Sequence, residues 1–158
     1  DCPGVSSFCG AAAALEAEYT LPGISQSVVI TRMAGRTPVP EKESVRSFAA
    51  HQATMVLFLS TGLLRELSAE LMEGGYSEDT PAAIVYKATW PEQKVLRCTV
   101  GTLEQTAKEA DVTKTALIVV GEVLDGTYER SKLYDPTFTT EFRQASCSKK
   151  DSGQNGDD

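Results

Sequence analysis

The segment 81–100 constrains the fold most, because a buried strand has to end there and the chain has to reverse. Residues 82–86 form a short apolar run of small, β-branched and aromatic side chains, which is typical of a strand with little exposed face. Pro91 biases Trp90 toward an extended conformation and blocks a helix, so the strand ends before it. Residues 95–100 resume the apolar pattern, and the segment therefore predicts a hairpin.

The turn of this hairpin, residues 86–90, is the first place to look for a binding site. In open α/β sheets, ligands lie in the crevice beyond the carboxyl ends of strands. The alternative is an ordinary strand connection in which Trp90 covers the core. The composition of the turn alone leaves both interpretations open.

The rest of the chain alternates short apolar runs with segments of helical periodicity. Strands separated by helices indicate an α/β fold, and the hairpin makes its sheet mixed. We expect a mixed, mostly buried sheet flanked by helices. Strands are predicted at 27–31, 54–59 and 114–121, and helices at 8–15, 41–52, 63–74 and 102–110.

Two helix starts carry specific expectations. Ser6 or Ser7 is the natural N-cap of the first helix, whose free amide groups could also contact a polar or anionic ligand group. An equal alternative is that these serines only cap the helix. The spacing from Thr102 to Gln105 predicts a capping box at the start of the last helix.

The connection 32–40 contains Arg32, Arg36, one glycine and two prolines. Guanidinium groups pair with carboxylates in two-point geometry, so this loop either holds a carboxylate-bearing ligand or is simply solvated. Residues 128–138 alternate charged and aromatic side chains and are expected to form an ordered extension. Residues 146–158 have nothing to bury and are expected to form a disordered polar tail.

The composition excludes several classes of function. A net charge of −7, from 15 basic and 22 acidic residues, argues against nucleic acid as the main partner. No apolar run reaches the length of a bilayer span, so we expect a soluble protein without a membrane partner. The cysteines include no Cys-x-x-Cys pair and are expected to be reduced thiols, which indicates a cytoplasmic protein. Four separated cysteines and the single His51 do not form a metal site. No Ser/His/Asp set or phosphate loop is present, which leaves common hydrolase chemistry unsupported.

The chain resembles the second half of the tetrapyrrole methylases, and within that family the branch that acts on precorrin-4. The resemblance runs in order from Pro3 to about Arg143, and its most specific pieces are GRTPVPE, YKATWP and RSKLYDPTF. The segments that carry it are PGVSSFCGAAAAL, ITRMAGRTPVPE, HQATMVLFLS, GGYSEDTPAAIVYKATWPEQK, KTALIVVGEVL and YERSKLYDPTFTTEFR.

The resemblance implies a fold and an activity. Family members have two α/β domains with S-adenosyl-L-methionine in the cleft between them, and they act as homodimers. Residues 1–145 would then be the carboxyl-terminal domain, without the amino-terminal one. The implied reaction is methylation of carbon 11 of precorrin-4 or cobalt-precorrin-4 in cobalamin biosynthesis, although the isolated chain is expected to be inactive. The alternatives are another tetrapyrrole methylase and a non-catalytic dimerisation module.

The resemblance also implies cofactor contacts. Ser6 and Ser7 match the polar pair that touches the methionine end of the cofactor. Leu59, preceded by Phe58, stands where relatives often have methionine. Ala88 and Ala116 match small residues that leave room for adenine beside the backbone. No general base is named.

The substrate contacts are a separate hypothesis. Arg32 and Arg36 are expected to hold the carboxylates of the substrate, because their loop should border the cleft.

Overall fold

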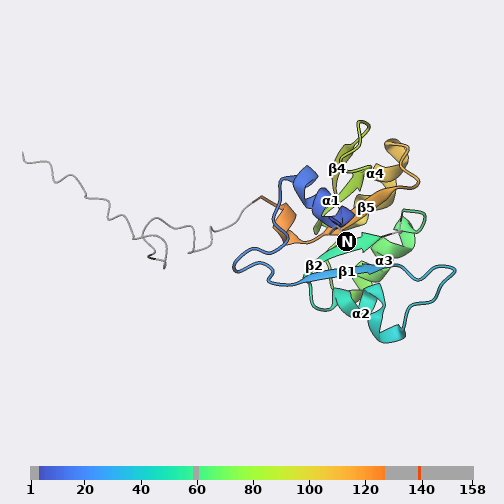
Figure 1. Ribbon diagram of the computed structural model, residues 1–158. Coiled ribbons are helices and arrows are strands. Elements are labelled where there is room, and N and C mark those ends of the chain that lie inside the picture. Colours follow the sequence, from blue (N-terminus) through green and yellow to red (C-terminus); the bar gives the residue numbers. More distant parts are fainter. Residues whose placement is uncertain (1–3, 59–60, 127–138, 140–158) are drawn as a thin grey trace, which may run out of the picture. The chain divides into compact units, whose positions relative to one another are not determined.

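The computed structural model describes residues 4–58, 61–126 and 139. Its centre is a five-stranded sheet of order β1-β2-β5-β3-β4 (Figure 1). The predicted α/β class, with a mixed sheet flanked by helices, is confirmed. The strands are β1 (Val28–Arg32), β2 (Thr54–Phe58), β3 (Pro81–Tyr86), β4 (Lys94–Thr99) and β5 (Ala116–Val120).

The sheet is more antiparallel than the sequence indicates. The hairpin of β3 and β4 is present, and β1 pairs parallel with β2. However, β5 runs antiparallel to both of its neighbours, β2 and β3. As a result, β1, β2 and β3 all finish at one end of the sheet, which we call its carboxyl end, and β4 and β5 begin there.

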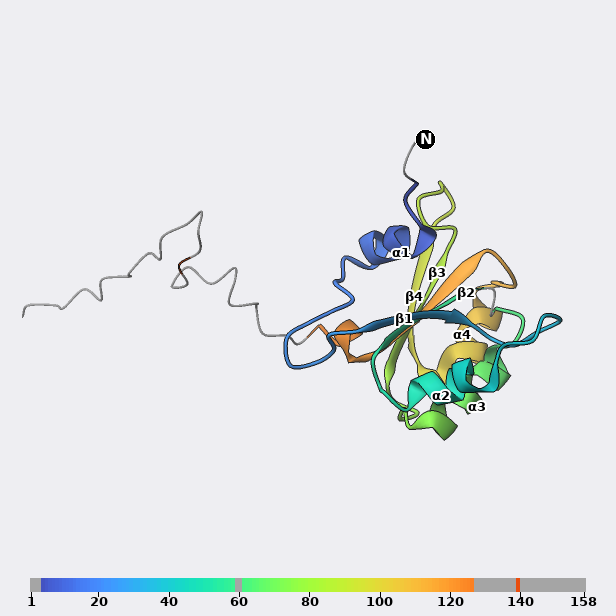
Figure 2. The same ribbon diagram turned by 60° about the horizontal axis from the view of Figure 1, so that its bottom comes forward.

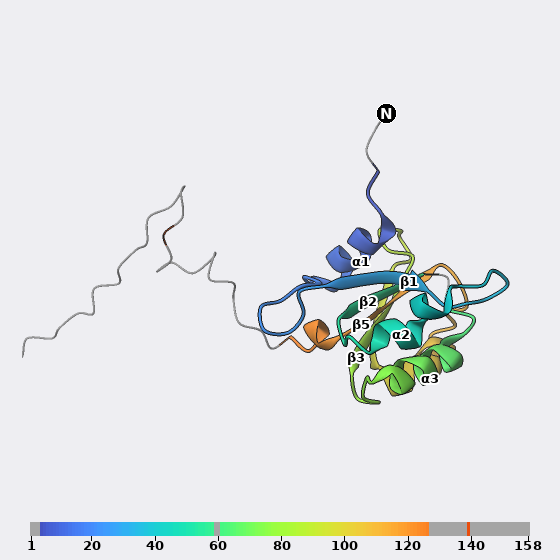
Figure 3. The same ribbon diagram turned by 90° about the horizontal axis from the view of Figure 1, so that it is seen from below.

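Helices cover both faces of the sheet (Figures 2 and 3). The first face carries α2 (Val45–Ala49), α3 (Leu64–Gly74) and α4 (Leu103–Glu109), whose buried side chains form one core cluster with alternate residues of the strands. The second face carries α1 (Ser7–Leu15), which packs in a separate cluster. Met55 and Leu57 belong to the first cluster and Val56 to the second, so β2 is buried on both sides.

The predicted helix 41–52 is wrong as a single element. Ser44 has an extended backbone, with φ −61° and ψ 153°, and divides a short 3₁₀ turn (Glu41–Glu43) from α2. Its hydroxyl oxygen accepts a hydrogen bond from the amide of Ser47 at 3.2 Å. The helix therefore restarts at a serine cap, because the Ser44 hydroxyl satisfies an amide of the first turn of α2 that has no partner within the helix.

The capping box lies one turn earlier than predicted. Thr99 and Thr102 exchange the two bonds of the box, around a 3₁₀ turn (Val100–Thr102), and the amide of Thr99 donates to Oγ1 of Thr102 at 2.9 Å. Thr102 is the N-cap of α4 but makes no capping bond with its own side chain there. The capping box therefore joins Thr99, the last residue of β4, to Thr102, and does not join Thr102 to Gln105 as predicted.

The helix predicted at 63–74 is confirmed as α3. Leu64, Leu67 and Leu71 are buried against the sheet. The helix ends at Gly74, and Gly75 follows with φ 120°, a conformation that favours glycine.

Several predictions fall outside the described residues: Leu59, the extension at 128–138 and the polar tail at 146–158. In the described part, no helix has the length and apolar character needed to cross a bilayer.

Gly74 tests the close contact between α2 and α3. A Cβ added there would lie 2.4 Å from Cβ of Ala49 and 2.6 Å from the backbone oxygen of Arg46. Overpacking of this kind costs about 1–3 kcal/mol, which exceeds the gain in helix propensity of about 1 kcal/mol. Gly74→Ala should therefore lower the free energy of unfolding by about 1 kcal/mol in a urea titration.

The matched control is Gly35→Ala, because an added Cβ at Gly35 meets no atom within 4 Å. It should leave the urea midpoint nearly unchanged. Equal midpoints for the two variants would show that the helices do not approach this closely.

Candidate functional site

A pocket of about 480 Å³ opens at the carboxyl end of the sheet. It lies where the start of α1, the end of β2, the loop after β3 and the start of β5 meet, and we call it the β3 pocket. Four residues predicted as cofactor contacts line it, together with two lysines from the adjoining loops: Ser7, Phe58, Lys87, Ala88, Lys114 and Ala116.

Strand register brings these residues together. Ala116 opens β5 directly opposite Tyr86, the last residue of β3. One step further, the amide of Lys87 donates to the carbonyl oxygen of Thr115 at 3.0 Å, which holds the two loops side by side. Ala88 follows in the first loop, and Phe58 ends the neighbouring strand β2. The predicted site at 86–90 thus coincides with a pocket.

The start of α1 is held against this pocket from the second face. A Cβ added to Gly10 would lie 3.6 Å from Cγ2 of Thr89 and 3.7 Å from Cβ of Ala88, so the helix touches the loop after β3. The hydroxyl of Tyr19 donates to the carbonyl oxygen of Phe8 at 2.7 Å. Burial, and then the nearby Cys9, raise the pKa of Tyr19 to about 12, so this donor stays protonated well into alkaline solution.

The backbone around the pocket adopts rare conformations. Lys87, Thr89 and Thr115 have φ values of 45°, 71° and 57°. Positive φ is uncommon for residues other than glycine and is a true outlier for β-branched threonine. Strain of this kind gathers at ligand sites, where the surrounding structure has to enforce it.

Trp90 does not cover the core, so that part of the alternative for the hairpin turn is wrong. The side chain is 56% exposed and lies at the pocket. The ammonium of Lys87 is 5.1 Å from the Trp90 ring centroid and 5.4 Å from that of Tyr86. It also lies 3.8 Å from a carboxylate oxygen of Glu92.

Three predicted site residues are not among those that line this pocket: Ser6, Arg32 and Arg36. Ser6 is the N-cap of α1, but its side chain makes no capping bond. Nη1 of Arg32 donates to the carbonyl oxygens of Met33 and Thr37, both at 3.1 Å, and Nη2 donates to that of Pro38 at 3.2 Å. Arg32 therefore organises its own loop.

Sequence reasoning passed over Lys87, Lys114, Thr115 and Trp90 as lining residues. Lys87 and Trp90 were inside the segment already chosen, but their chemistry was not weighed. Nothing in the sequence around Lys114 and Thr115 indicated that they line a pocket. Only the antiparallel placement of β5 brings its start beside the end of β3.

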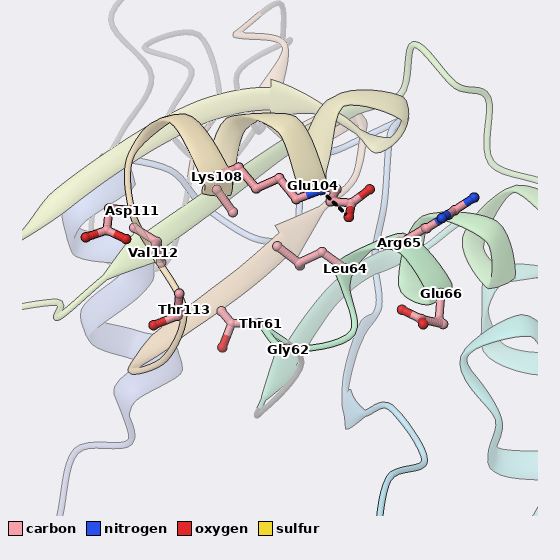
Figure 4. Close-up of a pocket in the computed structure, with 11 residues that line it drawn as sticks. Thr61, Gly62, Leu64, Arg65, Glu66, Glu104, Lys108, Asp111, Val112 and Thr113 are labelled. Carbon is pink, nitrogen blue, oxygen red and sulfur yellow. Dashed lines mark hydrogen bonds and ion pairs between the residues drawn. The ribbon is translucent and has the colours of Figure 1, made fainter.

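A second pocket of about 570 Å³ adjoins the first and shares Thr61, Gly62 and Thr113 with it. We call it the α4 pocket. Figure 4 shows charged side chains of both signs around it, with the ammonium of Lys108 2.7 Å from a carboxylate oxygen of Glu104. The hydrogen bond from Lys108 lowers the pKa of Glu104. Among the described residues, no group of three side chains could hold a metal ion.

Comparison with known proteins identifies the family. Residues 2–104 match the family model described as Tetrapyrrole (Corrin/Porphyrin) Methylases. The chain belongs to the tetrapyrrole methylase family. The resemblance noted in the sequence is thereby confirmed.

Individual relatives point to one branch of this family. A cobalt-precorrin-4 C(11)-methyltransferase of Methanocaldococcus jannaschii is 49% identical over 144 residues, which are 90% of this chain and 56% of the relative. A protein of the same name from Priestia megaterium is 47% identical and covers 90% of this chain and 57% of its own. The chain thus spans just over half the length of these curated relatives.

Solved structures agree on the fold. A cobalamin biosynthetic enzyme, cobalt precorrin-4 methyltransferase CbiF, superposes with a TM-score of 0.76 at 47% identity, over 78% of this chain and 52% of its own. A uroporphyrin-III C-methyl transferase of Thermus thermophilus, solved with S-adenosyl homocysteine, has a TM-score of 0.64 at 21% identity, over 82% of this chain and 53% of its own. The second likeness concerns the fold alone.

The strained backbone at Thr115 gives a direct test of this site. Glycine adopts a φ of 57° without strain, so Thr115→Gly should remove a backbone strain of about 1–3 kcal/mol. The greater freedom of glycine in the unfolded chain destabilises the fold by about 0.5–1 kcal/mol, which offsets part of this gain. Thr113→Gly makes the same chemical change two residues away, at a position without positive φ. It relieves no strain, so it should only lower the free energy of unfolding. We expect the free energy of unfolding of the Thr115→Gly variant to be about 1 kcal/mol higher than that of the Thr113→Gly variant. The reverse order in urea titrations would mean that Thr115 is not strained.

Proposed function

We propose that this chain is one part of an S-adenosyl-L-methionine-dependent methyltransferase that methylates carbon 11 of precorrin-4 or cobalt-precorrin-4 in cobalamin biosynthesis. The names of the relatives at 49% and 47% identity support this substrate. One structural observation carries the proposal: Ser7, Phe58, Ala88 and Ala116, taken from four separate segments, line a single pocket.

The β3 pocket suits the adenosine part of the methyl donor. Its volume of about 480 Å³ lies within the usual range of small-molecule sites. Val85 and Leu117 supply apolar surface, and the alanines at 88 and 116 leave the backbone accessible to a flat ring. Leu59, proposed beside Phe58, would extend this apolar wall.

The protein contributes alignment in this proposal. The bound donor supplies an activated methyl group on sulfur, and an electron-rich ring carbon of the substrate attacks it as S-adenosylhomocysteine leaves. Ser6 and Ser7, at the start of α1, would hold the methionine end of the donor. No imidazole or carboxylate is among the described residues that line the pocket, so we assign the chain a positioning role and no general base.

The remaining wall of the cleft would come from sequence that the relatives have and this chain does not span. We propose that the complete enzyme is a cytoplasmic homodimer with a second α/β domain. A ligand shared by two domains loses much of its buried area when one is absent, so the 158-residue chain alone should bind the donor weakly. The second candidate is a non-catalytic dimerisation module, which would bind no donor even when the second domain is present.

Another reaction within the family is less well supported. A uroporphyrinogen-III C-methyltransferase of Bacillus subtilis is 28% identical over 127 residues, against 49% for the relative that acts on cobalt-precorrin-4. The position of the new methyl group in the product would distinguish these two activities.

The deciding experiment is a calorimetric titration with S-adenosylhomocysteine. The protein to use is a two-domain fusion, in which the first half of the Methanocaldococcus jannaschii relative precedes this chain. We expect Ala116→Leu to raise the dissociation constant at least about tenfold, because the larger side chain occupies space proposed for adenine.

Ala13→Leu is the control, since Ala13 is exposed on α1 and outside the pocket. It should bind as the unaltered fusion does, and urea midpoints should show that both variants fold. Unchanged binding in Ala116→Leu would remove the β3 pocket as the donor site. A fusion that folds but binds no S-adenosylhomocysteine would favour the dimerisation module.

A further inference from the structure

The β3 pocket and the α4 pocket differ in charge. The described lining of the β3 pocket includes Lys87 and Lys114 and no acidic residue, although the whole chain carries a net charge of −7. The α4 pocket beside it mixes cations and carboxylates, as Figure 4 shows. The concentration of positive charge is therefore specific to the proposed ligand site and does not follow from overall composition.

The two lysines are brought together by the backbone. The amide of Lys87 donates to the carbonyl oxygen of Thr115 at 3.0 Å, which puts Lys87 beside the residue that follows Lys114. Both lysines line the same pocket, so an anion bound there would be attracted by two positive charges.

Lys87 is held in place before any ligand arrives. Its ammonium lies over the rings of both Tyr86 and Trp90, at 5.4 and 5.1 Å from their centroids. Its contact with Glu92 is long, at 3.8 Å, and the Glu92 side chain is 60% exposed. An ion pair of this length with a largely exposed carboxylate is weak, so a ligand carboxylate can replace Glu92 as the partner of Lys87.

Lys114 is available for an anion. Within the described residues, its ammonium makes no hydrogen bond or ion pair. This contrasts with Arg32, whose guanidinium donates to three carbonyl oxygens of its own loop. A side chain without protein partners can give all its donors to a ligand.

We propose that Lys87 and Lys114 form a carboxylate-binding pair at the β3 pocket, and that its occupant is a carboxylate side chain of the tetrapyrrole substrate. The identity of the occupant rests on the proposed function, whereas the affinity for carboxylates rests on the lysines alone. A carboxylate could also come from the methionine end of the donor. The pair, rather than Arg32 and Arg36, then orients the substrate ring over the pocket.

The chain contains its own reporter for this site. Trp90 is the single tryptophan, it lines the β3 pocket, and it lies against Lys87. A porphyrin bound at the lysine pair would quench its fluorescence. We would titrate the 158-residue chain with uroporphyrin, which carries eight carboxylates, and follow Trp90 emission. We expect saturable quenching that weakens as salt is added.

Lys114→Gln is the main variant. Lys87 lies over the Trp90 ring, so replacing Lys87 would also change the fluorescence of the reporter itself. Lys114→Gln should raise the dissociation constant for uroporphyrin about threefold to tenfold, with a similar effect for Lys87→Gln. Lys114→Arg should retain binding. Lys108→Gln makes the same change in net charge at the α4 pocket, where Lys108 pairs with Glu104, and should bind uroporphyrin normally.

Binding of two further ligands to the two-domain fusion distinguishes a carboxylate of the donor from a carboxylate of the substrate. If the donor supplies it, Lys114→Gln weakens S-adenosylhomocysteine but not methylthioadenosine, which lacks the amino-acid end, and the substrate assignment fails. If the substrate supplies it, both of these ligands bind as before.

Absence of uroporphyrin binding by the chain, or equal losses in Lys114→Gln and Lys108→Gln, would overturn the lysine pair. Neither result bears on whether Ala116→Leu impairs donor binding, so this proposal and the proposed function can fail separately.

Discussion

The position of strand β5 is the constraint on which the rest of the structure depends. It lies between β2 and β3, runs antiparallel to both and has buried side chains on both faces. Because of this direction, β5 begins where β2 and β3 end. One strand thus joins the two halves of the sheet and brings Ala116 to the same end as Phe58 and Ala88. A parallel β5 would have put Ala116 at the opposite end, away from the pocket.

Backbone geometry shapes the β3 pocket as much as its side chains do. The bond between the amide of Lys87 and the carbonyl of Thr115 fastens two loops whose residues have positive φ. Helix α1 lies against one of these loops at Gly10, where an added Cβ would be in ordinary van der Waals contact with Thr89 and Ala88. The small side chains of Ala88 and Ala116 leave the backbone at this end of the sheet accessible from the pocket.

The positions of the basic residues in the sequence did not indicate which of their side chains would be free to bind a ligand. Arg32 and Arg36 lie in a loop rich in proline, which made them reasonable candidates for carboxylate binding, yet Arg32 donates to three carbonyl oxygens of that loop. Lys114 stood next to an apolar run and had no distinguishing neighbours. A long cation can bind its own backbone or a ligand, and only the surrounding acceptors decide between these partners.

The sequence by itself determined the elements and the family. Apolar runs marked each of the five strands, leucine spacing marked α3, and motifs such as YKATWP identified a tetrapyrrole methylase. It misjudged the segment 41–52, because a serine that caps a helix also fits inside a helical pattern. Tertiary structure alone decided the direction of β5, the contact of Lys87 with the segment at Lys114, and the position of the β3 pocket beside the α4 pocket. The physical reason is that strand pairing and loop contacts join residues far apart in the chain, whereas periodicity and capping act between neighbours.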